Sequence, residues 1–320
     1  MRAESPGPSV SKLVPKIQST AIILYGIYIF LTLLQICLLM LNGLPLFDSL
    51  IISFGTAGTG GFGHKADSLA SFSSNVQVIT TLFMILFGIN FNVYFLLLFK
   101  KPKQALKSEE ARYYLGIIAA VTALIVWNVR PMFETFAQAL KHVAFQVASI
   151  ITTTGFSTTN FDQWPEFSKG LLVALMFIGA CAGSTGGGIK VSRFVILFKT
   201  MKKEIQQIIH PRSIKVIRFE GKPVEHGVLR SINTYFAAYM LIFIVSLILI
   251  CLNNFDLITN FTAVAATLNN VGPGLQLVGP TGHFGDFNAL SKLVMIFDML
   301  AGRLELFPLL LLIVPSSWRK

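Results

Sequence analysis

Charged residues are scarce in this chain of 320 residues. They make up 13% of the sequence, whereas hydrophobic residues make up 53%. A soluble domain carries about 25% charged residues, so these few charges do not suffice to cover a folded chain of this length against water. The composition therefore excludes an ordinary soluble domain and predicts an integral membrane protein.

Cysteine is rarer still. Cys37, Cys181 and Cys251 lie far apart, in or beside apolar runs, which gives neither a disulfide framework nor a zinc-binding spacing. The five histidines form no ligand cluster, and no Ser/His/Asp or Cys/His arrangement stands out. We therefore expect no enzyme activity and no covalently bound cofactor.

Long apolar runs are abundant, and a membrane-crossing helix needs about 20 such residues. Six runs are long enough to be counted as spans: Ala21–Leu41, Val76–Phe99, Tyr113–Val129, Gly170–Phe198, Tyr235–Leu252 and Leu290–Val314. Shorter helix-compatible segments lie between successive pairs of spans: Phe47–Ala57, Phe133–Thr152 and Phe255–Leu268. A helix of 12 residues reaches only about 18 Å, so the first and third are predicted to enter the membrane and stop halfway. The second is longer, and its first turns are expected in the interface.

Each of these half-helices leads into a short Thr/Asn/Gly turn. The turns read TAGTGGFG (Thr56–Gly63), SIITTTGFSTT (Ser149–Thr159) and ATLNNVGPGL (Ala266–Leu275). One Thr-Gly turn is weak evidence, but three at matching positions form an internal repeat of about 100 residues. The repeat predicts an all-α membrane protein with three span–half-helix–span units around a pore.

Basic residues are unevenly distributed. Most of the 26 precede the first span, follow the last, or lie between spans two and three and between spans four and five. The positive-inside rule makes that side cytoplasmic, so the turns open outward among several acidic residues that would concentrate cations. For Asp48, Glu134 and Asp256, a role at the helix N-terminus is a stronger explanation than cation attraction, since an acid is favourable at the N-terminus of any helix.

Turns of this kind have a clear chemical use inside a membrane. A non-helical turn is tolerated there only where it faces protein or water, and its carbonyl oxygens can replace the water shell of a cation such as K⁺. Glycine supplies the backbone angles that point the carbonyl groups at the ion. Side-chain hydroxyl or amide oxygens could contribute further ligands. The predicted ion-binding filter comprises Thr59, Gly60, Gly61, Thr153, Thr154, Gly155, Asn270, Val271 and Gly272.

Five motifs carry a family resemblance. They are GTAGTGGF (Gly55–Phe62), ITTTGFST (Ile151–Thr158), GSTGGGIKVSR (Gly183–Arg193), LNNVGPGL (Leu268–Leu275) and GRLELFPLLLL (Gly302–Leu312). Together they resemble the Trk/Ktr/HKT superfamily of potassium transporters, most closely the Trk-type uptake membrane subunit. The resemblance implies one filter glycine per repeat, which by position are Gly61, Gly155 and Gly272, and these favour K⁺ as the transported ion.

Members of that superfamily have four repeats, whereas three are visible here. We expect a cytoplasmic link over residues 1–16 and pore repeats over 17–101, 102–210 and 211–320, corresponding to family repeats two, three and four. The first repeat is then expected to be missing. The alternative to potassium uptake by this chain is a truncated, non-conducting fragment or a subunit that needs a separate first repeat.

Span four contains an unusual run of glycine. Gly183, Ser184, Thr185, Gly186, Gly187 and Gly188 argue against a continuous helix, because glycine costs about 1 kcal/mol relative to alanine. The family resemblance implies an intramembrane gating loop here, and the alternative is a close helix–helix crossing through small residues. A phosphate-binding loop is excluded, because Ile189 separates the last glycine from Lys190 and no strand precedes the run.

An arginine lies near the middle of span six. Arg303 would cost about 2.5–3.5 kcal/mol there, so it must face the pore or a buried partner. We predict a fixed positive charge that meets the gate or sets a barrier in the pore; the alternative is a structural pair with an acid or with loop carbonyls.

The resemblance also implies partners and a location. These are a homodimer in the bilayer of the cytoplasmic (inner) membrane, with both termini inside, and a nucleotide-binding regulatory subunit in the cytoplasm. The basic segment Lys199–Arg230 is the predicted docking surface.

Overall fold

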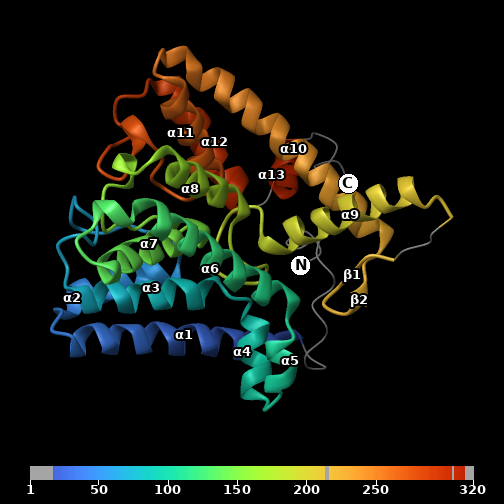
Figure 1. The fold of residues 1–320 in the computed structure, drawn as a ribbon, viewed down its shortest axis with the longest axis horizontal. Helices are drawn as coiled ribbons and strands as arrows, with labels where there is room; N and C mark the ends of the chain where they lie inside the picture. Colours follow the sequence, from blue (N-terminus) through green and yellow to red (C-terminus); the bar gives the residue numbers. More distant parts are fainter. Residues whose placement is uncertain (1–16, 213–215, 305, 314–320) are drawn as a thin grey trace.

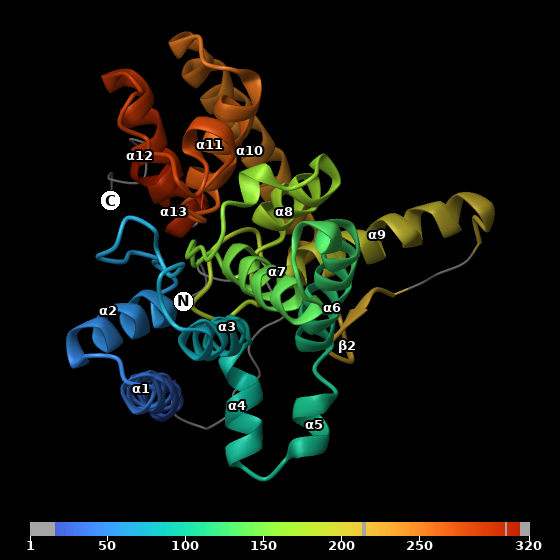
Figure 2. The same cartoon turned by 60° about the vertical axis from the view of Figure 1, so that its left-hand side comes forward.

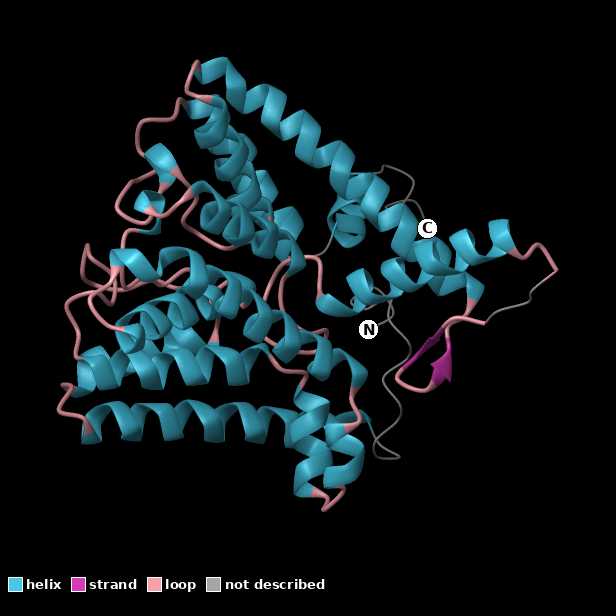
Figure 3. Cartoon of the chain, in the orientation of Figure 1, coloured by secondary structure: helices cyan, strands magenta, loops and turns pink. Residues whose placement is uncertain are grey.

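The fold is almost entirely helical (Figures 1 and 3). The computed structural model describes residues 17–212, 216–304 and 306–313; the predicted link over residues 1–16 lies outside them. The helices are α1 (Ile17–Leu41), α2 (Leu46–Ala57), α3 (Ser74–Gly88), α4 (Phe91–Leu98), α5 (Pro102–Leu106), α6 (Glu109–Val129), α7 (Phe136–Ile151), α8 (Glu166–Ile178), α9 (Val191–Ile209), α10 (His226–Ile250), α11 (Leu257–Leu268), α12 (Ala289–Arg303) and α13 (Leu306–Ile313). Strands β1 (Arg218–Phe219) and β2 (Lys222–Pro223) form a short antiparallel hairpin. The predicted all-α class is confirmed.

The same arrangement of helices occurs three times. A long helix is followed by a half-helix and a turn, and then by a second apolar segment: α1, α2 and α3–α4; α6, α7 and α8–α9; α10, α11 and α12–α13. Each half-helix packs against the long helix before it (Figure 1). In Figure 2, α1 and α3 are both seen nearly end on, so the axes of these two helices are nearly aligned.

The half-helices begin at residues suited to that position. Thr135 caps α7 by accepting a hydrogen bond from the Gln138 N–H, and Asp256 caps α11 by accepting from the Thr259 N–H at 2.9 Å. Asp256 is exposed; desolvation raises its pKa, but the hydrogen bonds from Thr259 and nearby backbone N–H groups together hold that pKa below its usual range. The helix-terminus explanation of this acid is therefore supported.

The second apolar segment of each repeat is not a continuous helix. Within the part of the chain that the structure describes, three helices are long and apolar enough to span a membrane alone: Thr20–Leu41, Glu109–Met132 and His226–Asn253. The run expected as span two bends by 90° between α3 and α4, span four is interrupted between α8 and α9, and span six divides into α12 and α13. Among these three expected spans, only the interruption of span four was predicted from sequence.

Burial separates the half-helix α7 from the outer helix α1. In α7, the side chains of Val143, Val147 and Ile150 are fully buried. On α1, Tyr25 and Phe30 are 69% and 63% exposed, although both are large and apolar. Such side chains suit a lipid environment, because an apolar surface of this extent is unstable in water. The half-helix α7 thus lies inside the molecule, whereas α2 keeps Phe47 (65%) and Phe54 (59%) exposed at its surface.

Candidate ion-binding turns and intramembrane loop

Three turns follow the half-helices α2, α7 and α11, and share one backbone conformation. We name them turn 1 (Gly58–Gly61), turn 2 (Thr152–Gly155) and turn 3 (Asn269–Gly272). In each, the second and fourth residues have positive φ: 49° and 65° at Thr59 and Gly61, 58° and 86° at Thr153 and Gly155, 56° and 108° at Asn270 and Gly272. Left-handed backbone of this kind is open to glycine and costly for most other residues.

Hydrogen bonding explains the shared shape. In turn 2 the Thr153 N–H donates to the Ile150 carbonyl (3.0 Å) and the Thr154 N–H donates to the Ser149 carbonyl (2.8 Å). This pair of bonds is a Schellman C-cap, which ends a helix with a left-handed residue. The equivalent bonds occur in turns 1 and 3. The backbone N–H groups therefore point back at the half-helix.

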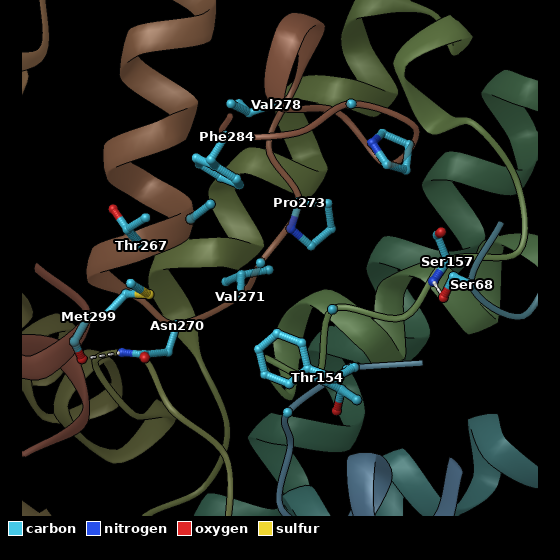
Figure 4. Close-up of a pocket in the computed structure, with 18 of the residues that line it drawn as sticks. Ser68, Thr154, Ser157, Thr267, Asn270, Val271, Pro273, Val278, Phe284 and Met299 are labelled. Atoms are coloured by element: carbon cyan, nitrogen blue, oxygen red, sulfur yellow. Dashed lines mark hydrogen bonds between the residues drawn. The ribbon is translucent and has the colours of Figure 1, made fainter. Parts of the chain in front are cut away.

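The carbonyl groups of the turns are left available. Among the described residues, no hydrogen bond reaches the carbonyl oxygens of the nine predicted filter residues. Most of these residues line a cavity of about 890 Å³: Thr59, Gly60, Gly61, Thr154, Gly155, Asn270, Val271 and Gly272. Figure 4 shows Thr154 of turn 2 and Val271 of turn 3 among the residues that line this cavity. Turn backbone from all three repeats thus borders one cavity.

The turns are packed edge to edge. A Cβ atom placed on Gly61 would lie only 1.8 Å from the carbonyl oxygen of Thr154, and one on Gly155 only 2.2 Å from that of Val271. On Gly272 the nearest atom would be the Gly155 Cα, at an ordinary 3.8 Å. Glycine is therefore needed at Gly61 and Gly155 both for its backbone angles and for space.

Two side chains of the predicted filter form hydrogen bonds with neighbouring segments. The Thr153 hydroxyl is fully buried and accepts a hydrogen bond from the Gly187 N–H at 2.6 Å. The Asn270 amide donates to the Met299 carbonyl at 3.1 Å, the dashed line in Figure 4. These contacts hold turn 2 against the intramembrane segment that contains Gly187 and turn 3 against α12, and the backbone carbonyl oxygens of Thr153 and Asn270 accept no hydrogen bond from the described residues.

The glycine-rich segment forms an irregular loop between α8 and α9. We call Gly179–Lys190 the intramembrane loop; Gly179, Gly183 and Gly188 have φ near +70°. Thr59 Oγ lies 3.0 Å from the Thr185 carbonyl oxygen, and Gly187 packs under Thr153 and the Asn269 carbonyl. Because the span is broken here, the glycines do not serve a close crossing of two continuous helices. None of Gly183–Gly188 lines the cavity, so the loop lies against the three turns from outside it.

Arg303 reaches turn 1. It lies at the end of α12, where span six breaks, and it lines the cavity. Its Nη2 donates to the Gly58 carbonyl (3.2 Å) and its Nη1 to Thr59 Oγ (3.4 Å). Asp298, one acid near Arg303 in the sequence, instead accepts a hydrogen bond from Ser246 on α10 (2.7 Å). Arg303 thus places a cationic group beside the turn, next to a hydroxyl that also contacts the loop.

Other chemistry is sparse in this region. Within the described residues, no group of three or more His, Cys, Asp or Glu side chains is placed to hold a metal ion. Cys181 is buried at the start of the intramembrane loop, and the ring of His142 contacts the Thr158 hydroxyl (3.0 Å). The turns and the loop are therefore the features that call for a functional explanation.

A comparison with protein families shows which family this chain belongs to. The model of the TrkH cation transport proteins matches residues 2–138 and 117–320, which is nearly the whole chain. The chain belongs to the TrkH family. The resemblance read from the five sequence motifs is therefore confirmed, and membership of a transporter family also confirms that this chain is not an enzyme.

Individual TrkH-family proteins are similar along almost all of this chain. The Trk system potassium uptake protein TrkH of Salmonella typhimurium is 37% identical over 325 residues, covering 100% of this chain and 67% of the relative. TrkG of Escherichia coli is 32% identical, covering 99% and 66%. The crystal structure of the potassium transporter TrkH from Vibrio parahaemolyticus superposes with a TM-score of 0.89 at 36% identity, covering 97% of this chain and 67% of that one.

Sequence reasoning missed two residues that organise this region. Asn90 caps α4 at the 90° bend, and Glu110 near the start of α6 contacts both ends of the intramembrane loop. Asn90 had a local signal, since an asparagine before an apolar run is a preferred N-cap. Glu110 had none, because its partners are 72 and 82 residues away.

Proposed function

We propose that this chain carries K⁺ inward across the cytoplasmic membrane, through an ion-binding site built from the carbonyl groups of turns 1, 2 and 3. The observation that carries this proposal is the matching backbone of the three turns, with N–H groups turned to the half-helices and unbonded carbonyl groups beside one cavity. The names of the similar proteins, which are potassium uptake proteins, support K⁺ as the ion.

Electrostatics favours a cation at this place. Each half-helix ends at its turn, and a helix C-terminus carries about half a negative charge. Three such ends converge on the cavity, and carbonyl oxygens at this point substitute for the water that a K⁺ ion loses. The membrane potential, negative inside, drives the ion inward once the path is open, at about 2.3 kcal/mol per 100 mV.

The intramembrane loop and Arg303 form the proposed gate. The loop closes against turns 1 and 2 on the side away from the cavity, through Thr185 and Gly187. Arg303 holds a positive charge beside turn 1. In this proposal an ion leaving the turns toward the cytoplasm meets both, and the contacts of the loop and of Arg303 with the turns support a closed state of the pore.

Orientation and partners complete the proposal. Both termini are placed in the cytoplasm by the positive-inside rule. The chain is proposed to act as a homodimer with a cytoplasmic nucleotide-binding regulatory subunit, docked on the basic segment that follows the intramembrane loop. On α9 this segment presents the exposed bases Lys202 and, partly, Lys203.

Growth at low potassium tests the proposed function. Cells without their own potassium uptake systems are expected to grow when they express this chain, and to accumulate potassium faster than cells with an empty vector. Membrane insertion is checked by fractionation and blotting. Failure to grow despite insertion would contradict uptake by this chain alone, and would favour a non-conducting fragment or a subunit that needs a separate first repeat.

A further inference from the structure

One buried carboxylate holds both ends of the intramembrane loop. Oε1 of Glu110 accepts a hydrogen bond from the Ala182 N–H at 2.7 Å and another from the Ser192 N–H at 3.2 Å. Ala182 lies near the beginning of the loop, and Ser192 lies in the first turn of α9, just after its end. Glu110 is only 2% exposed. The two attachments therefore share one oxygen atom in the interior.

The same carboxylate also reaches the bend in span two. Its Oε2 accepts from the Asn90 side-chain amide at 3.4 Å, and Asn90 lies at the break between α3 and α4. The next residue, Phe91, donates its N–H to the Gly183 carbonyl in the loop at 3.1 Å. Glu110 thus joins the broken spans of two repeats at the level of the loop.

A buried carboxylate is costly unless hydrogen bonds compensate for its lost hydration. Here three N–H groups surround it, and hydrogen bonds to a charged acceptor are stronger than those between neutral groups. Two of the three come from backbone at the two ends of the loop. They form only while both ends stay where they are, so the carboxylate stabilises this position of the loop over any other.

The cytoplasmic hairpin fixes the position of Glu110 in turn. Its two-residue turn, Glu220 and Gly221, has positive φ at both positions, as a tight hairpin turn requires. Glu220 Oε1 accepts from the backbone N–H of Glu110 (3.0 Å) and from the Ser108 hydroxyl (2.9 Å). Figure 2 shows the hairpin beside the end of α6 that Glu110 occupies. A displacement of the hairpin would therefore move the start of α6.

We propose that Glu110 is the positioning residue that holds the intramembrane loop against the turns, and that Glu220 links it to the cytoplasmic hairpin. This rests on the proposed function, in which the loop is the gate. Moving the hairpin displaces the first turn of α6, withdraws the carboxylate from Ala182 and Ser192, and releases both ends of the loop together. A partner that binds and moves the hairpin at the cytoplasmic surface would thereby open the loop without contacting the pore.

The test measures access to the loop and needs no transport. Cys37, Cys181 and Cys251 are replaced by serine, and Thr185→Cys supplies a single thiol in the loop. The rate of its modification by a maleimide is measured on the full chain in detergent micelles. Glu110→Gln is expected to raise that rate by about tenfold or more, because a neutral amide holds the two N–H groups less strongly. Glu225→Gln, the same charge change at an exposed residue just after the hairpin, is expected to leave it unchanged.

The rate is compared at its high-pH plateau, because thiolate is the reactive form and a change in thiol pKa alone shifts the midpoint and not the plateau. A role confined to fold stability would lower the thermal midpoint and leave the plateau rate unchanged, which would overturn the proposal. Glu220→Gln is a second variant that leaves the buried carboxylate in place, and we expect a smaller rise from it. An unchanged modification rate in Glu220→Gln would contradict the link between the hairpin and the loop. If Glu110→Gln does not fold, the same result would contradict the whole proposal.

Potassium uptake by the same variants separates this inference from the proposed function. Faster modification together with faster uptake supports both. Faster modification without uptake in any variant supports the role of Glu110 and contradicts uptake by this chain. If the chain takes up potassium but Glu110→Gln and Glu220→Gln are modified at the same rate as Glu225→Gln, the proposed role of Glu110 is contradicted and the proposed function is not.

Discussion

Gly155→Ala is expected to reduce K⁺ uptake by about tenfold or more and to weaken the preference for K⁺ over Na⁺. The added methyl group would overlap the Val271 carbonyl oxygen, and φ at this position is +86°. Strained backbone of this kind costs about 1–3 kcal/mol, and the chain relieves it by turning carbonyl groups away from the cavity. Uptake of K⁺ and of Na⁺ into ion-depleted cells at matched expression measures both effects.

Two substitutions calibrate this result. Gly116→Ala adds the same methyl group to α6, where nothing lies within 4 Å, and it should leave uptake unchanged. Gly272→Ala has backbone strain but no steric overlap, so its effect should be smaller than that of Gly155→Ala. Equal uptake and equal selectivity in Gly155→Ala and Gly116→Ala would show that the turn backbone does not contact the ion.

Arg303→Gln should increase K⁺ flux by about tenfold or more. The guanidinium lies in the cavity beside the Gly58 carbonyl. A unit charge about 8 Å from a cation opposes it by about 2 kcal/mol at an effective dielectric constant of about 20, and 1.4 kcal/mol corresponds to tenfold. Efflux of rubidium from vesicles containing the purified chain measures the change.

Arg303→Lys is the matched control for charge. It keeps the positive charge but loses the planar group that contacts Gly58 and Thr59 together. Flux close to that of the unmodified chain would assign the barrier to charge, whereas flux as high as in Arg303→Gln would assign it to the hydrogen bonds at turn 1. A decrease of flux in Arg303→Gln would contradict a barrier role for this residue.

The sequence was most informative where the determinants are local. The half-helices were foreseen because each is a short apolar segment that stops at a glycine turn, and their observed bounds lie within a few residues of those expected. The turns were marked by glycines two positions beyond Thr59, Thr153 and Asn270, since glycine readily adopts the left-handed backbone found there. The fold class and the family followed from the repetition of this local pattern.

Features that depend on distant contacts were not predictable. Val76–Phe99 and Leu290–Val314 are uniformly apolar enough to be taken as single spans, yet both are broken. At the first break, the Cys181 N–H donates to the Gly88 carbonyl and the Phe91 N–H donates to the Gly183 carbonyl, so the intramembrane loop replaces the missing helical bonds. The hydrogen bonds of Glu110 to the loop are likewise made across spans and leave no local pattern.

The most direct test of the central claim is the binding of K⁺ to the three turns, measured without transport. The purified chain in detergent is heated in increasing K⁺ or Na⁺ at constant ionic strength. A bound ion stabilises the folded state, by about 2.7 kcal/mol at 100 times its dissociation constant. We predict a saturable rise in the thermal midpoint with K⁺, a smaller one with Na⁺, and loss of the difference in Gly155→Ala. Equal midpoints in K⁺ and Na⁺ for the unmodified chain would contradict a K⁺ site at these turns.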